Sequence, residues 1–176
     1  ALNILARGAT GFRRDDMLCV ATKGKEGQPP TCLSLEWPQS QYYLMRTGWT
    51  PDALYMLLKN GPYTSHEHFD SLGFVMQALE NPVFMDPGVY IYGTPETMRL
   101  MATKSHCSIT VDEKSVYNDG GPNRFFGGKD FDLLTAEGPG YQGLPDSIRP
   151  IRRVAFLQPD YWVVSDVVRG NGNHKM

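Results

Sequence analysis

The residues that could do chemistry are gathered around histidines. His66 and His68 stand two positions apart, and His106 begins a run of β-type composition. Asp86, in a Met-Asp-Pro-Gly segment, adds a carboxylate. In an extended strand, residues two apart project to the same face, so His66 and His68 can point together at one site. Imidazole and carboxylate suit zinc, so the pattern predicts a metal or catalytic centre.

A second interpretation of the histidine pair stays open. A His-x-His pair also occurs by chance on solvated loops, where it binds nothing. Taken alone, His66 and His68 are therefore compatible with a plain surface segment.

Composition narrows the class of protein. The chain has 176 residues, of which 41% are hydrophobic and 20% charged, and this is enough for one domain with a sizeable core. Seventeen basic and nineteen acidic residues give a net charge of −2, so the overall charge of the chain does not attract nucleic acid. The sequence contains no apolar stretch of membrane-spanning length and no signal sequence at its start. Because it begins Ala1-Leu2-Asn3, we expect a processed or excised piece.

The cysteine pattern argues against a disulfide framework. Cys19, Cys32 and Cys107 make an odd number and form no Cys-x-x-Cys motif, although one bridge remains possible. Cys107 follows His106 directly, and adjacent strand residues face opposite sides, so we expect a buried apolar thiol rather than a nucleophile.

Short β-type runs dominate after the first thirty residues. Residues 14–23 are the only helix that the pattern predicts near the start, and a turn-rich linker over 24–30 follows. Beyond it, apolar and aromatic runs alternate with Gly, Pro, Asn and Asp clusters, which is typical of an antiparallel sandwich or barrel. The strands expected are 42–46, 53–58, 72–79, 83–85, 89–92, 108–112, 132–137, 152–157 and 161–168, with a loop over 119–128. The fold class predicted is all-β: an antiparallel two-layer β-sandwich with a short N-terminal helical segment.

An ordered series of segments resembles one family. The chain is similar, over roughly residues 40–170, to the C-terminal half of heparinase II/III-like polysaccharide lyases, which include heparin-sulfate and oligoalginate lyases. The matching segments are 42–49, 51–53, 61–63 leading into 66–70, 85–92, 106–112 and 159–166.

The resemblance implies a domain organisation. In whole enzymes of this family the sandwich sits behind an N-terminal toroid of α-helix pairs, and an acidic polysaccharide lies in the cleft between them. Residues 1–35 would be the tail and linker of that toroid, and 36–176 the sandwich, truncated at its C-terminus. The partners expected are the toroid domain or chain and the polysaccharide, with no nucleic acid and no membrane. A periplasmic or secreted location is also implied.

The resemblance also assigns roles to the histidines. His66 would lie near the substrate as an active-site residue, whereas His68, Asp86 and His106 would hold a zinc ion of architectural role. One departure is that Cys107 stands where the family usually has Asn.

The chemistry implied is β-elimination of a uronic acid. It needs a neutralised carboxylate, a base at C5 and an acid at the leaving O4. In the family much of this comes from the toroid, so we expect the chain alone to be inactive or nearly so. Tyr90 and Tyr92 are candidate acids by position only, and the alternative is that they pack a face of the sandwich.

Several other polar residues can each be interpreted in two ways. Arg46, beside Trp49, could bind a sugar carboxylate or form a structural ion pair at the sandwich edge. Asp70 could orient a histidine or cap a turn. The cluster of Arg149, Arg152 and Arg153 could contact an acidic polymer or form a solvated face. His174 is expected to be solvent-exposed.

Two rival functions remain beside the lyase. One is a non-catalytic β-sandwich module that binds carbohydrate or stabilises an assembly. The other is a free-standing metal hydrolase or cupin-like enzyme that uses the same His and Asp residues.

Overall fold

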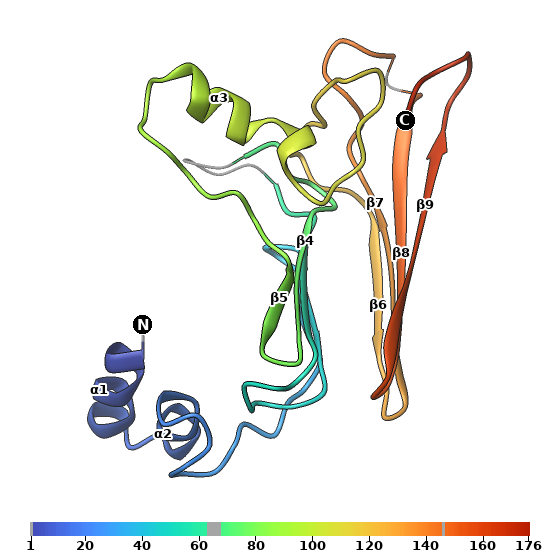
Figure 1. Ribbon diagram of the computed structural model, residues 1–176. Helices are drawn as coiled ribbons and strands as arrows, with labels where there is room; N and C mark the ends of the chain where they lie inside the picture. The colour runs from blue at the N-terminus through green and yellow to red at the C-terminus, as the bar shows by residue number, and fades with distance from the viewer. Residues whose placement is uncertain (1, 63–67, 146) are drawn as a thin grey trace.

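Antiparallel pairing organises most of the chain into two sheets. The computed structural model describes residues 2–62, 68–145 and 147–176. A five-stranded sheet has the order β1-β2-β3-β4-β5 and a four-stranded sheet the order β6-β7-β8-β9, so each sheet is a meander (Figure 1). The first sheet comprises β1 (Leu35–Trp37), β2 (Tyr42–Arg46), β3 (Tyr55–Lys59), β4 (Phe74–Ala78) and β5 (Asn81–Phe84), and the second β6 (Asn123–Gly127), β7 (Phe131–Glu137), β8 (Arg149–Leu157) and β9 (Tyr161–Arg169). The two sheets pack face to face, which confirms the predicted two-layer sandwich.

Alternation along the strands builds the core between the sheets. Tyr43 and Met45 of β2 and Met56 and Leu58 of β3 are buried and belong to one apolar cluster. Their neighbours in sequence face the other side of the sheet. The four-stranded sheet contributes Leu134, Ala136, Val154 and Phe156, and the segments between strands add Leu72 and Ile109. The outer face of the first sheet is thereby left for other contacts.

The N-terminal residues form two helices rather than one. Helix α1 (Leu2–Phe12) precedes α2 (Asp15–Ala21), and both lie beside the lower end of the five-stranded sheet (Figure 1). Sequence reasoning predicted only the second, because Gly8 and Gly11 lower the helix propensity of α1. A Cβ at Gly8 would come within 2.4 Å of the Met17 side chain, so the glycine allows the helices to approach closely. Among the described residues, no helix is long and apolar enough to cross a bilayer.

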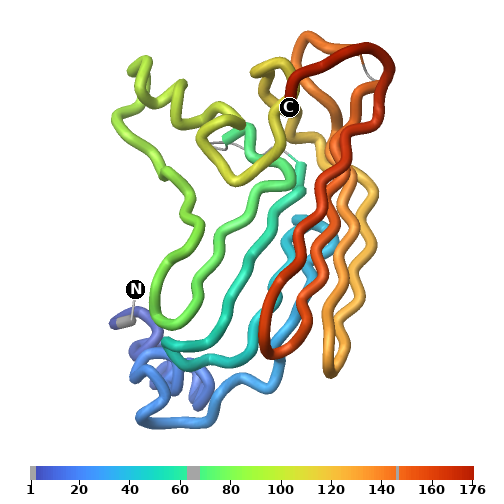
Figure 2. Tube along the Cα trace, turned by 45° about the vertical axis from the view of Figure 1, so that its right-hand side comes forward, coloured from blue at the N-terminus to red at the C-terminus, as the bar shows by residue number. Residues whose placement is uncertain are grey.

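A long segment between β5 and β6 separates the two sheets in sequence. After β5 the chain rises away from the sheet, forms α3 (Pro95–Met101) and the 3-10 turn η1 (Thr103–Ser105), and returns toward the upper end of the sandwich (Figure 2). Thr94 caps α3 by accepting a hydrogen bond from the amide of Thr97 at 3.4 Å. This segment between β5 and β6 carries residues that lie at the upper end of the five-stranded sheet.

Most expected strands are confirmed within a few residues, but three expectations are wrong. Residues 89–92 form no strand, and in 108–112 only Val111 makes an isolated bridge. The expected loop over 119–128 contains β6, which pairs along its full length with β7.

The C-terminal segment is tied back to the loop at Asp112. His174 Nδ1 lies 2.6 Å from Asp112 Oδ2, and the Lys175 amide donates to Asp112 Oδ1 at 2.9 Å. The hydrogen bond with Asp112 raises the pKa of His174, and the bond with His174 lowers the pKa of Asp112. His174 is thus exposed as a residue, as expected, but it has a defined partner.

The contact between His174 and Asp112 is expected to stabilise the fold only over a limited pH range. The stabilisation from the raised His174 pKa is full below the unfolded value of about 6.5 and is lost as pH rises through the folded pKa. The stabilisation from the lowered Asp112 pKa is full above the unfolded value of about 3.9 and is lost as pH falls through the folded pKa. We expect an NMR titration of His174 to show a midpoint above the ordinary value, and Asp112→Asn to return it. An unchanged midpoint in Asp112→Asn would contradict the contact.

Candidate metal centre

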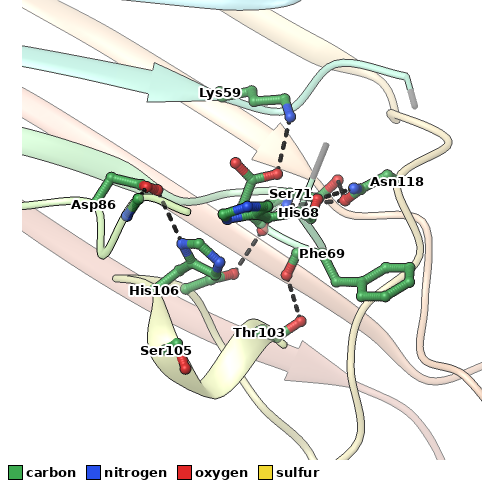
Figure 3. A network of polar contacts seen from close by, with 12 residues as sticks. Lys59, His68, Phe69, Ser71, Asp86, Thr103, Ser105, His106 and Asn118 are labelled. Atoms are coloured by element: carbon green, nitrogen blue, oxygen red, sulfur yellow. Dashed lines mark hydrogen bonds and ion pairs between the residues drawn. The ribbon is translucent and has the colours of Figure 1, made fainter. Parts of the chain in front are cut away.

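Three side chains from separate segments converge at the upper end of the five-stranded sheet. His68 lies between β3 and β4, Asp86 just beyond β5, and His106 just after η1. Each offers one ligand atom, and these atoms all lie within 4.8 Å of one another. His106 Nδ1 is 3.0 Å from Asp86 Oδ2, and the imidazole rings of His68 and His106 are 5.1 Å apart between centroids (Figure 3).

This spacing suits a small divalent cation. Tetrahedral zinc with ligands at about 2.1 Å holds its ligand atoms about 3.4 Å apart. The separation from His106 Nδ1 to Asp86 Oδ2 is 3.0 Å, and no two of the ligand atoms lie more than 4.8 Å apart. The spacing in a zinc site, about 3.4 Å, falls between these two distances. Two imidazoles and one carboxylate match zinc better than magnesium or calcium, which prefer oxygen ligands alone.

The burial of the cluster is uneven. The His106 side chain is 2% exposed, whereas that of Asp86 is 44% exposed, so the cluster opens to solvent on the Asp86 side. Within the described part of the chain, Nε2 of His106 is buried without a hydrogen-bond partner. An unsatisfied buried polar atom costs about 1–3 kcal/mol, which favours a functional rather than a stabilising role for this histidine. Three ligands with one open side are typical of zinc that keeps a water position.

Hydrogen bonds to the backbone hold the His68 segment in place. The side-chain amide of Asn118 donates to the carbonyl oxygen of His68, and Asn118 Oδ1 accepts from the Ser71 hydroxyl at 3.1 Å. The Thr103 hydroxyl donates to the Phe69 carbonyl at 2.5 Å and accepts from the Val116 amide at 2.9 Å (Figure 3). These bonds fasten the segment that carries His68 to the segment that precedes His106.

Asp86 and Asp70 play different parts. Asp86 Oδ1 accepts from the Gly88 amide at 2.8 Å, which leaves Oδ2 directed toward His106. Asp70 forms an ion pair with Lys59 at 2.9 Å. Neither expected role, orienting a histidine or capping a turn, accounts for this ion pair.

The metal cluster adjoins a cavity on the sheet. This cavity has a volume of about 170 Å³ and is lined by residues that include Tyr42, Lys59, Asp70, Asp86 and His106. Tyr42 also lines a groove of about 500 Å³ that runs to Arg46 and Trp49. The cavity and the groove therefore share a wall on the outer face of β2 and β3, which connects the metal cluster to the Arg46 end of the sheet.

Arg46 lies flat against aromatic rings. Its guanidinium carbon is 3.7 Å from the centroid of Trp49 and 5.5 Å from that of Tyr55, and Nε donates to the Gly48 carbonyl at 2.5 Å. The Trp49 indole is fixed in turn by donating to the Cys32 carbonyl at 2.9 Å. Burial lowers the pKa of Arg46, but an arginine side chain stays charged. Its planar guanidinium, held against the aromatic rings, suits sugars that carry carboxylate or sulfate groups.

Two expected catalytic tyrosines lie away from any sandwich face. Tyr90 and Tyr92 are 59% and 65% exposed in the irregular excursion between β5 and α3, so the alternative that they pack a face of the sandwich is wrong. His66 lies outside the described residues. The expectation that His106 begins a strand is also wrong, because it follows η1 in a turn.

Two further expectations concern Cys107 and the arginine cluster. All three cysteines are free, and Cys107 is half-buried rather than buried as expected, although burial raises the pKa of its thiol. Arg153 is exposed, but Arg152 is buried and paired with Asp166, so the expectation of a solvated face is wrong for Arg152. Sequence reasoning also missed the supporting residues Lys59, Ser71, Thr103 and Asn118. The burial of Arg152 did have a signal in the sequence, because Arg152 shares the strand face of Val154 and Phe156.

Comparison with known proteins gives consistent matches. Residues 30–176 match the family model described as heparinase II/III-like, C-terminal. A heparin-sulfate lyase from Pedobacter heparinus is 29% identical over 153 residues, which is 83% of this chain and 23% of the relative. One from Bacteroides stercoris is 28% identical over 159 residues, 86% of this chain and again 23% of the relative. The chain thus spans about a quarter of the length of these curated relatives.

Solved structures show the same architecture. Heparan sulfate lyase HepC from Pedobacter heparinus, as a mutant, superposes with a TM-score of 0.85 at 26% identity, covering 94% of this chain and 27% of that one. A heparinase III gene product gives a TM-score of 0.85 at 27% identity, covering 97% of this chain and 27% of that one.

Proposed function

Since the chain belongs to the heparinase II/III-like family through its C-terminal domain, we propose that it is the β-sandwich part of a lyase that cleaves uronic-acid-containing polysaccharide by β-elimination. Heparan sulfate is the first substrate to test, because the curated relatives are heparin-sulfate lyases. The observation that carries the proposal is the convergence of His68, Asp86 and His106 beside a cavity that shares a wall with the groove on the outer sheet face.

The proposed metal is zinc, bound by these three side chains. When bound, it would supply a fixed positive charge that ties three loops at the end of the sheet. His68 and His106 would be oriented by the hydrogen bonds of their segments, and Asp86 by its bond from the Gly88 amide. The role proposed is architectural, since Asp86 and His106 come from loops that line the cavity next to the groove.

The proposed path of the polysaccharide follows the outer face of β2 and β3. Arg46, stacked on Trp49, would bind a uronate carboxylate or a sulfate, and the indole would offer an apolar face to the sugar. His66, which the family resemblance places near the substrate, remains the proposed active-site residue. In this arrangement the chain holds and orients the substrate.

The remaining chemistry would come from a helical toroid domain or chain. Proton removal at C5 and protonation of O4 need further groups, of which Tyr90 and Tyr92 are candidates from this chain. We therefore expect the isolated chain to bind acidic polysaccharide with little or no turnover. The proposed location is periplasmic or secreted.

A reconstitution experiment tests this function. The chain, joined to the helical domain that the family resemblance implies, is incubated with heparan sulfate, and ultraviolet absorbance reports the unsaturated uronate product. We expect product from the wild-type sequence and from the control His174→Ala, and a loss of about 100-fold or more in His66→Ala, the scale of a general acid or base.

The rival functions predict other outcomes. Binding of heparan sulfate without product, in the joined protein and at saturating zinc, would favour the non-catalytic carbohydrate-binding or structural module. Turnover that yields saturated, hydrolysed ends would contradict the lyase and favour a metal hydrolase.

A further inference from the structure

Arg152 is a buried cation in an otherwise apolar strand face. It lies on β8, with Val154 and Phe156 at the next two inward positions, and is 4% exposed. Its partner in register on β9 is Asp166. The Arg152 side chain is 5% exposed and that of Asp166 35%, so the buried charge is that of the arginine. Burying a charge costs free energy that pairing offsets only in part, so the position calls for another explanation.

The guanidinium divides its hydrogen bonds between one carboxylate and two loops. Nε and one terminal nitrogen donate to the two oxygens of Asp166 at 2.8 and 2.7 Å. The other terminal nitrogen donates to the carbonyl oxygens of Leu72 at 2.6 Å and Cys107 at 2.5 Å. One planar group on the four-stranded sheet thus reaches two segments at the far side of the core.

Both segments carry proposed metal ligands. Cys107 is the residue next to His106, and Leu72 lies four residues after His68 in the segment that Asn118 and Thr103 also hold. The Ser108 hydroxyl donates to the Ser71 carbonyl at 2.6 Å, so the segments also touch each other directly beside the guanidinium.

We infer that Arg152, held by Asp166, is a positioning residue that sets the separation of His68 and His106 from the opposite sheet. The inference rests on the proposed zinc centre. Arginine suits the task because its rigid fork can bind Asp166 on one edge and the two carbonyls with its remaining nitrogen. A lysine ammonium, being a point charge on a flexible stem, cannot keep all three partners at these distances.

The test compares zinc affinity in matched variants of the chain. Arg152→Lys, Arg152→Met and Asp166→Asn are titrated with zinc against a chromophoric chelator, and cobalt absorption spectra report the ligand geometry. We expect zinc binding to weaken by about 10- to 100-fold, as is usual when a group that orients a metal ligand is lost. We also expect the cobalt spectrum of Arg152→Lys to change.

Two controls separate positioning from stability. Val154→Ala removes buried volume two residues along the same strand face, and valine has no group that could donate to either loop carbonyl, so the variant should lower stability and leave zinc affinity unchanged. Arg153→Met removes an exposed charge from the same strand and should change neither. If Arg152→Met does not fold, Arg152→Lys and Asp166→Asn decide the question against Val154→Ala.

The outcomes are distinct. Wild-type zinc affinity and an unchanged cobalt spectrum in folded Arg152→Lys and Asp166→Asn would overturn the positioning role while leaving the zinc centre intact. Equal losses in Val154→Ala and the Arg152 variants would also overturn it. A wild-type chain that binds no zinc would overturn the centre itself, and the positioning role with it.

Discussion

Replacing His106 by alanine is expected to abolish tight zinc binding. The variant leaves only His68 and Asp86 of the three converging ligands, and it removes a ligand whose side chain is 2% exposed. The loss of affinity should exceed the roughly 100-fold that follows from losing a mere supporting hydrogen bond. Titration of zinc into the purified, chelator-treated chain measures it.

The same change should remove the effect of zinc on thermal unfolding. A ligand that binds only the folded state stabilises by about 4 kcal/mol when present at about 1,000 times its dissociation constant. Wild-type protein should therefore unfold at a higher temperature with zinc, and His106→Ala should not. His174→Ala is the matched control, because that histidine contacts Asp112 and lies outside the metal cluster. Retention of wild-type zinc affinity by His106→Ala would refute the assignment.

Truncation of Phe156 is expected to be the most damaging single change in the core. Phe156 is fully buried between the sheets and stacks on Trp162, with ring centroids 4.5 Å apart and an interplanar angle of 14°. Phe156→Ala should lower the free energy of unfolding by about 3–5 kcal/mol, through lost burial and the cavity that remains. Since domains of this kind are stable by about 5–15 kcal/mol, the variant should approach the threshold of unfolding.

Denaturant unfolding in the presence of a metal chelator measures this effect without a contribution from zinc. Phe126→Ala on β6 is the control, because that residue is 54% exposed and its ring lies 5.5 Å from that of Phe131 between centroids. It should cost about 1 kcal/mol or less. Equal losses in the two variants would mean that the core does not lie between the two sheets.

The sandwich could be predicted where runs of apolar and aromatic residues are bounded by turn residues. Residues 42–46 and the final pair, β8 and β9, were predicted closely because their sequences are rich in Tyr, Val, Phe and other strand-forming residues. Residues 89–92 failed because their β-type composition is not matched by a pairing strand, and Ile91 is 60% exposed. Strand β6 was missed because its Asn and Gly residues are typical of turns, and it forms through pairing with β7.

Helices gave weaker signals than the strands. Helix α3 was missed although Thr94, Pro95 and Glu96 form a regular start signal, because the helix is only seven residues long. In α1 the contact of Gly8 with Met17 supplies the stabilisation that local propensity lacks.

The site could be predicted as a set of residues but not as a geometry. The identities of His68, Asp86 and His106 came from a resemblance, and their convergence depends on where three loops end. His106 approaches from a turn rather than a strand, because the Thr103 hydroxyl fixes η1 against the Phe69 carbonyl. Contacts of this kind join segments more than thirty residues apart, and local sequence patterns carry no information on them.

Anomalous diffraction at the zinc absorption edge tests the central claim most directly. Crystals of the wild-type chain grown with zinc should show one strong peak, about 2.0–2.2 Å from a nitrogen of His68, an oxygen of Asp86 and a nitrogen of His106. The absence of a peak at saturating zinc, or a peak bound by other side chains, would contradict the account.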